Sequence, residues 1–349
     1  MTATWQLDVM NLDGTSRQAA ATFESLTFSY VLDSPGSITA DLPMKATTST
    51  RTIFEPGQRE LRVLRNGVLV WGGDLWSAQV QLRDALTVNG EGYLARLRRR
   101  NVMADLIYDE INQQQIMWNL IAHTQAQTGG DRAITQGAHA GSSITRNRDY
   151  CALDHDEILS SIDELAQLDV GCDYEITPSP DSSVNKSFKT YQPRKGADLH
   201  ASVTLDQNNT MQLSYEINAS DTVSRADTIG GSDCNPPESD VTDSTALTNF
   251  GLLQSFESID SGQLRDVVAH NAETLRNGKV AHFTAQATFH EGSGATAWGA
   301  FVVGDIISLT ANRGYATFSG QQMRVVAMEV HLEPPSQSYT TVTLDSVIA

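Results

Sequence analysis

Acidic and imidazole side chains gather where Asp154, His155, Asp156 and Glu157 follow one another. Carboxylate and imidazole groups coordinate divalent cations, so this run has the chemistry of a metal site. It directly precedes residues 158–166, whose apolar residues recur at helical spacing, and acidic residues stabilise the start of a helix. We therefore interpret the run as a helix N-terminus and predict no metal site there.

Two histidines, His282 and His290, share the polar side of a segment in which apolar and polar residues alternate. In a strand, eight residues span about 26 Å, so the two imidazoles are too far apart to share an ion without outside ligands. The sequence predicts no metal and no cofactor.

Nucleophilic and hydrolytic motifs are absent from the sequence: it contains no HExxH, no phosphate-binding Walker loop and no Gly-x-Ser-x-Gly. Gly292-Ser293-Gly294 and Gly230-Gly231-Ser232 lack the required spacing and fit turns better. We predict no catalytic residues and no enzymatic activity. Carboxylates are plentiful, so composition alone leaves open a pair that acts on a glycan.

Basic residues cluster only at Arg96, Arg98, Arg99 and Arg100. A nucleic-acid site needs a wide basic face with interleaved aromatic residues, and the surrounding sequence does not offer one. We interpret the four arginines as candidate interface residues that pair with acidic residues of neighbouring modules. Trp298, in the Gly-rich segment 292–299, is the candidate for an exposed aromatic side chain that contacts a partner.

The chain has 349 residues with 24 Lys and Arg against 42 Asp and Glu, a net charge of −18. Residues 1–103 carry +1 and the remaining residues −19. Such an excess opposes a grip on nucleic acid, because binding neutralises phosphates with Lys and Arg. The sequence has no apolar run of about 20 residues and no secretory signal, so we expect a soluble chain without membrane insertion. Its cysteines, Cys151, Cys172 and Cys234, are too sparse for a disulfide framework, and we expect them to be reduced.

The elements that position these residues are mostly strands, so the predicted fold class is mainly β with an α+β insert. Closely spaced strands with short turns, such as Asn66-Gly67, predict a first small β-barrel module at residues 1–103. Residues 104–235 are predicted to be a helical and mixed insert. Residues 236–349 are predicted to be a second β-barrel module with short helices. Within these domains we expect helices at 104–128, 156–166 and 264–277, a loop at 136–147, and strands at 171–177 and 281–289.

An internal echo relates the two β modules. Gly57 and Gly73 flank a strand, a turn and a second strand, and Gly304 and Gly320 repeat this arrangement over the same sixteen positions. Glycines at matched offsets can mark the same tight turns on the same sheet, although two matched pairs can also arise by chance. The echo suggests that one chain carries two copies of one module.

Several stretches resemble the hub, or minor tail, proteins of long-tailed phages, especially siphophages of actinobacterial hosts. The resemblance is carried by these segments in order: Leu26-Thr27-Phe28-Ser29-Tyr30, Gly36-Ser37-Ile38-Thr39-Ala40-Asp41-Leu42-Pro43, Arg65-Asn66-Gly67-Val68-Leu69-Val70-Trp71-Gly72-Gly73, Gly90-Glu91-Gly92-Tyr93-Leu94 and Gly304-Asp305-Ile306-Ile307. Tyr191-Gln192-Pro193-Arg194-Lys195-Gly196 resembles the family's Tyr-Pro-basic-basic-Gly turn, with Gln192 interrupting it.

The resemblance implies a non-enzymatic structural protein of the virion, assembled in the host cytoplasm and located at the tail tip. It implies a homotrimer whose six barrels match the six-fold tail tube and surround the channel through which phage DNA leaves. The implied partners are the distal tail protein and tail tube, the end of the tape-measure protein, and receptor-binding or tip proteins. We expect the acidic charge to face the channel, so that DNA passes without specific binding.

Two alternatives remain open at this point. The chain could be a tail protein that binds or degrades host cell-wall glycan, with the site on loops of the β modules. It could also be a hexameric distal tail or tube protein.

Overall fold

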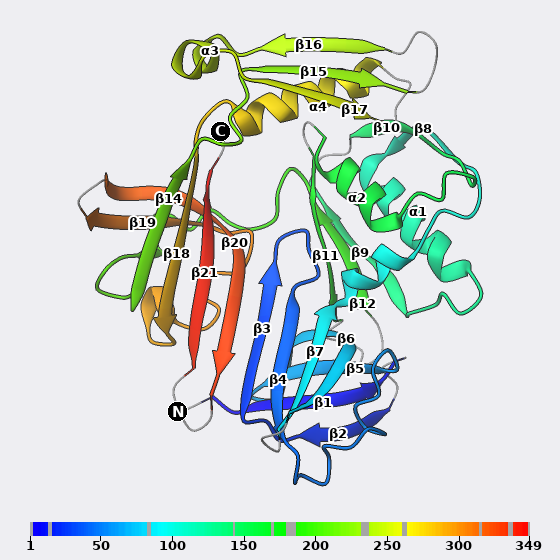
Figure 1. Cartoon of the computed structure of the whole chain (residues 1–349), viewed down its shortest axis with the longest axis vertical. Coiled ribbons are helices and arrows are strands. Elements are labelled where there is room, and N and C mark those ends of the chain that lie inside the picture. The colour runs from blue at the N-terminus through cyan, green and yellow to red at the C-terminus, as the bar shows by residue number, and fades with distance from the viewer. Residues whose placement is uncertain are drawn as a thin grey trace.

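The computed structural model describes residues 3–12, 16–81, 85–141, 144–168, 171–178, 186–231, 237–259, 264–313, 316–333 and 338–347. Strands dominate these ranges and helices cluster in the middle of the chain, which confirms the predicted mainly-β class with a helical insert (Figure 1). Cys234 lies outside the described residues.

Seven strands form the N-terminal module, because apolar side chains alternate with polar ones along most of them. The strands are β1 (Trp5–Asn11), β2 (Arg17–Ala21), β3 (Ser25–Val31), β4 (Ser37–Pro43), β5 (Arg59–Arg65), β6 (Val68–Gln81) and β7 (Ala85–Gly92), followed by the 3-10 helix η1 (Tyr93–Arg99). Leu26, Phe28, Ile38 and Leu42 are among the side chains that fill its core.

Strand β6 is continuous through Gly72 and Gly73. Glycine is needed at position 73 because β6 and β7 approach each other closely there, and not because the chain turns there. A Cβ atom at this position would lie 2.2 Å from the carbonyl oxygen of Glu91 in β7, so only glycine lets the two strands pair here.

The C-terminal module is built from strands that are spread more widely along the chain. They are β13 (Thr204–Leu205), β14 (Gln212–Asn218), β18 (His282–His290), β19 (Ile306–Arg313), β20 (Ala316–Leu332) and β21 (Tyr339–Ser346), with the 3-10 helix η2 (Gly294–Thr296) after β18. The predicted strand at 281–289 is confirmed as β18, whose Phe283, Ala285, Ala287 and Phe289 are buried.

The two modules have the same strand order. Across the sheet the N-terminal module reads β3-β4-β7-β6-β5-β1, and the C-terminal module reads β14-β18-β21-β20-β19-β13. If β2 is left out and the remaining six strands of each module are numbered along the chain, both orders are second, third, sixth, fifth, fourth, first. The modules differ in two ways: β1 and β5 are antiparallel whereas β13 and β19 are parallel, and the N-terminal module has an additional edge strand, β2, that pairs with β1. The duplication that the sequence echo suggested is therefore present in the topology. Of the two glycine pairs, only Gly57 and Gly304 are equivalent, because each donates its N–H to the neighbouring long strand, at Leu75 and Val325; Gly73 lies two residues before Leu75, whereas Gly320 lies five residues before Val325.

The two modules are joined edge to edge. β3 pairs antiparallel with the second half of β20, so that all thirteen strands form one sheet with two separate cores (Figure 1). Within the described residues no sheet closes on itself by hydrogen bonding, so each module is an open, curled sheet and not the closed barrel that the sequence suggested.

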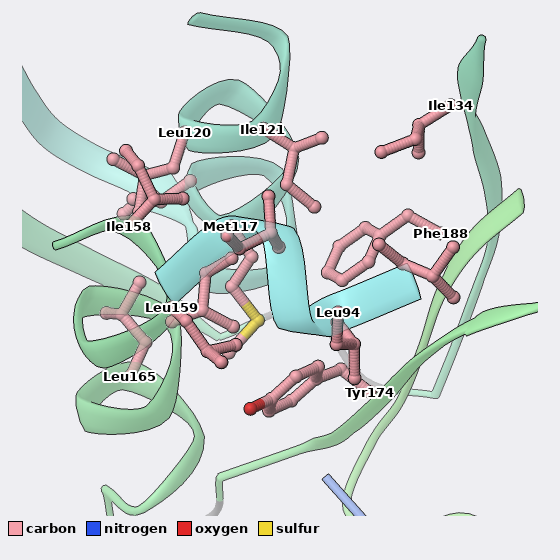
Figure 2. Close-up of a cluster of buried hydrophobic side chains, with 14 of the residues drawn as sticks. Leu94, Met117, Leu120, Ile121, Ile134, Ile158, Leu159, Leu165, Tyr174 and Phe188 are labelled. Atoms are coloured by element: carbon pink, nitrogen blue, oxygen red, sulfur yellow. The ribbon is translucent and has the colours of Figure 1, made fainter. Parts of the chain in front are cut away.

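The insert packs helices and small sheets over a core of its own. Its elements are β8 (Leu106–Asn112), α1 (Gln113–Ala126), β9 (Ile134–Ala140), β10 (Thr145–Tyr150), α2 (Ile158–Ala166), β11 (Asp173–Pro178) and β12 (Lys186–Tyr191). Figure 2 shows Met117, Leu120 and Ile121 of α1 meeting Leu159 of α2 and Leu94 of η1. The predicted second helix and the strand at 171–177 are confirmed as α2 and β11.

Two predictions within the insert are wrong. Residues 106–112 form β8 and not the first turns of a helix, because they pair with β10; the helix begins only at Asn112, whose side chain caps α1. Residues 134–140 form β9 and not part of a loop, because they pair in parallel with β12.

A third unit interrupts the C-terminal module. It contains β15 (Arg225–Gly230), β16 (Glu238–Thr242), α3 (Ser244–Phe250), β17 (Gln254–Ile259) and α4 (Leu264–Gly278), with β15 between the other two strands and α4 packed on the sheet (Figure 1). The predicted helix at 264–277 is confirmed as α4. None of the helices in the described ranges is both long and apolar enough to span a membrane.

Candidate functional site

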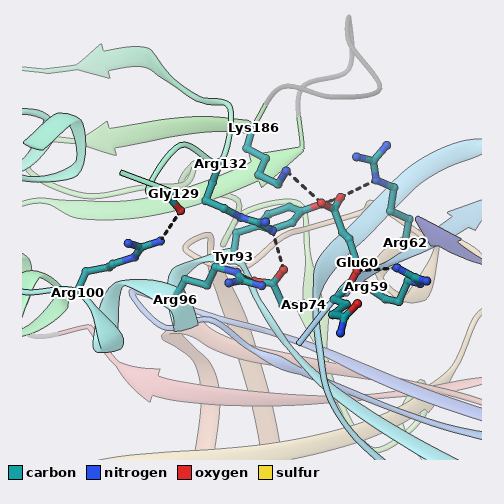
Figure 3. A network of polar contacts seen from close by, with 11 residues as sticks. Arg59, Glu60, Arg62, Asp74, Tyr93, Arg96, Arg100, Gly129, Arg132 and Lys186 are labelled. Carbon is teal, nitrogen blue, oxygen red and sulfur yellow. Dashed lines mark hydrogen bonds and ion pairs between the residues drawn. The ribbon is translucent and has the colours of Figure 1, made fainter. Parts of the chain in front are cut away.

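A buried carboxylate on β5 joins the N-terminal module to the insert. Glu60 is fully buried, and its Oε1 accepts hydrogen bonds from Arg62 Nε at 2.7 Å and from the Tyr93 hydroxyl at 2.6 Å. Lys186 Nζ, at the start of β12, lies 3.0 Å from Oε2 (Figure 3). Burial lowers the pKa of Lys186, and the nearby Glu60 opposes that effect. The cluster ties three segments of the chain together.

A second buried carboxylate, Asp74 of β6, lies beside the first. Arg96 Nε donates to its Oδ2 at 2.5 Å and Arg132 Nη2 donates to its Oδ1 at 3.0 Å (Figure 3). Burial raises the pKa of Asp74, and the two guanidinium groups act against that rise. Each of these charges has an opposite partner inside the chain, so we interpret the network as a structural clamp and not as a reactive centre.

The four candidate interface arginines lie on and just after η1, and they differ in availability. Arg96 is occupied by Asp74, and Arg100 Nη2 donates to the carbonyl of Gly129 at 3.5 Å. Arg98 and Arg99 are exposed. Arg98 forms a surface ion pair with Glu91 at 3.1 Å, and the Arg99 guanidinium lies 4.9 Å from the ring centre of Trp76. Of the four, Arg98 and Arg99 are therefore the two that are exposed and held only by surface contacts.

Trp298 is half-buried instead of protruding from its loop. Its ring meets Trp5 edge-on at 5.2 Å between centres, and the Arg65 guanidinium lies 4.9 Å from its centre. These contacts attach the loop after β18 to the N-terminal module, because an aromatic face attracts both a ring edge and a cation. A contact between Trp298 and another protein remains a prediction.

The residues with metal-ligand chemistry do not converge. Glu157 occupies the N-cap position of α2 but its side chain makes no capping bond, so the run 154–157 borders the helix without capping it. Within the described ranges no three histidine, cysteine or acidic residues are grouped as a metal site would require.

An apolar cavity of about 450 Å³ lies where the two modules and the insert meet. Its aromatic lining has little free polar chemistry: Tyr30 donates its hydroxyl hydrogen to the carbonyl of Val70, and Trp71 donates Nε1–H to the carbonyl of Ser29. The residues that line it include no histidine and no cysteine.

The shared sheet presents one continuous polar face opposite its two cores. Strand pairing places these side chains side by side across both modules, because directly opposed residues point to the same face. The face includes Gln286 and Thr288 of β18, Thr341 and Thr343 of β21, Glu329 of β20, Thr27 and Ser29 of β3, Ser37, Thr39 and Asp41 of β4, and Thr87 and Asn89 of β7.

Hydroxyl and amide groups on this face bond to one another along the sheet. Thr39 Oγ1 donates to Asn89 Oδ1 at 2.9 Å, and Asn89 Nδ2 donates to Ser77 Oγ at 3.1 Å. Thr87 Oγ1 donates to Asp41 Oδ1 at 2.6 Å. The same pattern joins Thr288 to Thr341 at 3.0 Å in the other module. Much of the face's hydrogen-bonding capacity is therefore already used.

The charge of this face is acidic. Asp41, Glu329 and Asp345 belong to it, and the described cation among its strands, Arg324 of β20, forms an ion pair with Asp173 of the insert. A phosphate backbone would meet carboxylates and hydroxyl groups here, with little basic charge to hold it.

Asp33, after β3, makes stability depend on pH. Its Oδ1 accepts from Tyr174 N–H at 2.7 Å, while burial and the neighbouring Asp173 carboxylate raise its pKa to about 8. The native state thus holds a proton that the unfolded chain releases near pH 4. This contribution to stability is complete below pH 4 and is lost as pH rises through about 8.

We expect Asp33→Asn to remove this dependence, because asparagine keeps the acceptor, tolerates the backbone φ of 52° and carries no charge. Denaturant unfolding at pH 5 and pH 8.5, at one protein concentration, measures the effect. The natural chain should lose stability with a slope of up to about 1.4 kcal/mol per pH unit, and the variant should lose less. Equal slopes for the two proteins would refute the assignment.

Sequence reasoning missed Glu60, Asp74 and Lys186 and also the polar face. The available signal was the order Glu60-Leu61-Arg62-Val63, in which two charged residues alternate with two apolar ones just before the Asn66-Gly67 turn. Such alternation is typical of a strand with one solvated face. Here the insert covers that face and buries the charged residues, which the sequence pattern alone does not show.

No protein-family model and no curated protein matches this sequence. Solved structures do match over nearly the whole chain. A tail protein from Neisseria meningitidis MC58 aligns with a TM-score of 0.64 and 12% identity, covering 98% of this chain and 96% of that chain. The 43 kDa tail protein of prophage MuSo2 from Shewanella oneidensis aligns with a TM-score of 0.64 and 10% identity, covering 97% and 98%.

A third match is the E. coli c3393 protein, described as a type VI secretion component with structural similarity to the T4 tail proteins gp27 and gp5. It aligns with a TM-score of 0.52 and 11% identity, covering 96% of this chain and 76% of that chain. At these identities the likeness concerns the fold. The duplicated modules, the helical insert and these neighbours together show that the chain has a phage tail hub-like fold.

Proposed function

We propose that this chain is a non-enzymatic structural protein of a phage tail tip, in which three copies form a ring of six β modules. The observation that carries the proposal is the duplicated strand order, β3-β4-β7-β6-β5-β1 and β14-β18-β21-β20-β19-β13, within a tail-like fold. A six-fold tube can be matched by three chains only if each chain supplies two similar modules. The duplication provides such a pair.

In this proposal the polar face of the shared sheet lines the channel. Both modules place their cores on the same side of the sheet, and β5, β1, β19 and β13 curl behind it. A ring has more room outside than inside, so the thicker side faces outward and the thin polar face inward. DNA then passes a wall of hydroxyl, amide and carboxylate groups that does not retain it.

The proposed location is the tip of the virion tail. The partners are the distal tail protein and tail tube on one side, and the tape-measure end and receptor-binding or tip proteins on the other. Arg98 and Arg99, both exposed, and the loop that carries Trp298 are the proposed contact points with neighbouring proteins.

We propose domain boundaries that follow the sheets. Residues 1–103 form the first module, and the insert ends before β13. The second module combines 204–218 with 282–347, and the unit at 225–278 is inserted between its strands. This division differs from a boundary at residue 235, because β15 and β16, on either side of that residue, pair with each other.

Native mass measurement of the purified chain tests the proposal. Three copies of the 38.0 kDa chain give a species of 114 kDa. Six copies, or 228 kDa, would favour a distal tail or tube protein instead. Incubation with host cell walls adds a second readout, since pelleting with the walls or clearing of them would support a glycan-directed protein and count against this proposal.

A further inference from the structure

The structure contains one junction between modules, and its geometry is fully described. β3 pairs antiparallel with the second half of β20, from Val31 opposite Ala327 to Leu26 opposite Leu332. At this junction Val330 is 1% exposed and lies opposite Phe28. The contact is therefore a buried strand pairing with a fixed register.

The duplication identifies the counterparts of these two strands. Gly57 N–H donates to the carbonyl of Leu75 in β6 at 2.8 Å, and Gly304 N–H donates to the carbonyl of Val325 in β20 at the same distance. Leu75 thus corresponds to Val325, and β6 continues beyond Leu75 as β20 continues beyond Val325. By the common strand order, β14 corresponds to β3.

Both counterparts have open edges within the described part of the chain. β14 pairs only with β18, and residues 77–81 of β6 pair only with β7. Apolar side chains stand exposed along them: Val80, the counterpart of Val330, is 64% exposed, and Ile217 of β14 is 46% exposed. Long exposed edges with apolar side chains are templates for strand addition.

We infer that β14 of one copy pairs antiparallel with residues 77–81 of β6 in the next copy, repeating the β3–β20 junction. Transferring the internal register places Ile217 opposite Ala78 and Tyr215 opposite Val80. The occupant of each edge is thus a second copy of this chain. This inference rests on the proposed trimer and specifies which strands form its interface.

The arrangement of the edges favours a closed assembly. β14 lies at one end of the shared path and β6 lies in the far module, so each copy offers one donor strand and one acceptor edge (Figure 1). Such a head-to-tail contact closes into a ring when the rotation per copy allows it. In a ring of three copies, internal and intermolecular junctions alternate, giving six similar joints.

Disulfide cross-linking tests the register. In a chain with Cys151→Ser and Cys234→Ser, Ala78→Cys combined with Ile217→Cys places two thiols on opposed residues of one face, within reach of a disulfide after small adjustments. Mild oxidation should yield covalent trimers under denaturing, non-reducing conditions. The matched control, Ala78→Cys with Glu216→Cys, points one thiol to the opposite face and should yield far less.

Placing a charged side chain in the proposed β14–β6 junction tests how much this junction contributes to assembly. Val80→Glu buries an unpaired carboxylate at the proposed contact, so the protein concentration at half-assembly should rise at least tenfold. Val68→Glu is the control, because Val68 is 66% exposed on the same strand but outside the contact. It should leave assembly unchanged.

The outcomes separate the two proposals. Suppose that the natural chain assembles to 114 kDa, that the variant with Ala78→Cys and Ile217→Cys forms no cross-link, and that Val80→Glu assembles as well as Val68→Glu. This result would overturn the proposed junction and leave the proposed trimer intact. A chain that neither assembles nor cross-links at high concentration overturns both.

Discussion

Glu60→Ala should lower the free energy of unfolding by about 3–5 kcal/mol, because it leaves buried cations without their counter-charge. Lys186 and Arg62 are 1% and 6% exposed, and both meet the Glu60 carboxylate. The Tyr93 hydroxyl would lose its acceptor as well. Urea unfolding of the variant and the natural chain at one concentration measures the difference.

A surface ion pair in the same module provides the control. Glu55 pairs with Arg51 at 3.0 Å, but the Arg51 side chain is 88% exposed. Glu55→Ala should therefore change the unfolding free energy far less than Glu60→Ala does. If the Glu60 and Glu55 variants lose similar amounts, the network does not act as a clamp between the module and the insert.

Adding lysines to the polar face should convert a non-adhesive channel into one that retains DNA. Thr39 of β4 and Gln286 of β18 occupy equivalent positions in the two modules, and both are exposed. Thr39→Lys with Gln286→Lys places six cations around a trimeric channel. We expect the natural trimer to retain no DNA and the variant to retain linear duplex at low salt. Six phosphate contacts would make the logarithm of affinity fall with a slope of about −5 in the logarithm of salt concentration.

The shape of the DNA distinguishes the channel from the outer surface. Linear duplex can thread a ring, whereas a covalently closed circle cannot, so the variant should retain at least tenfold more linear than circular DNA. Gln18→Lys with Ala20→Lys adds the same charge to the exposed strand β2 and should not discriminate. A channel variant that remains trimeric but treats both DNA forms alike would place the polar face outside the lumen.

Local pattern was sufficient for much of this fold. Alternation predicted β18, and the apolar spacing of residues 158–166 predicted α2. The spacing of Leu106, Ile107 and Ile111 fits a helix as well as a strand, and only pairing with β10 makes it β8. β9 has almost no apolar alternation and exists through its pairing with β12, which lies far away in sequence.

The candidate site depended still more on long-range contacts. Matched glycines suggested the duplication, but its strand order follows from pairings such as β14 with β18, which bring together distant segments. The basic cluster was visible, yet the sequence could not show that Asp74, in the same module, already occupies Arg96. The open edges of β6 and β14 are likewise invisible in sequence, because exposure depends on which strands lie beside them.

A density map of the assembled tail tip tests the central claim most directly. The account predicts three copies of this chain in a ring of six β modules, with β14 of each copy continuing the sheet of its neighbour at β6 and the polar face toward the DNA path. Six copies in the ring, or β14 and β6 remote from the contacts between copies, would contradict it.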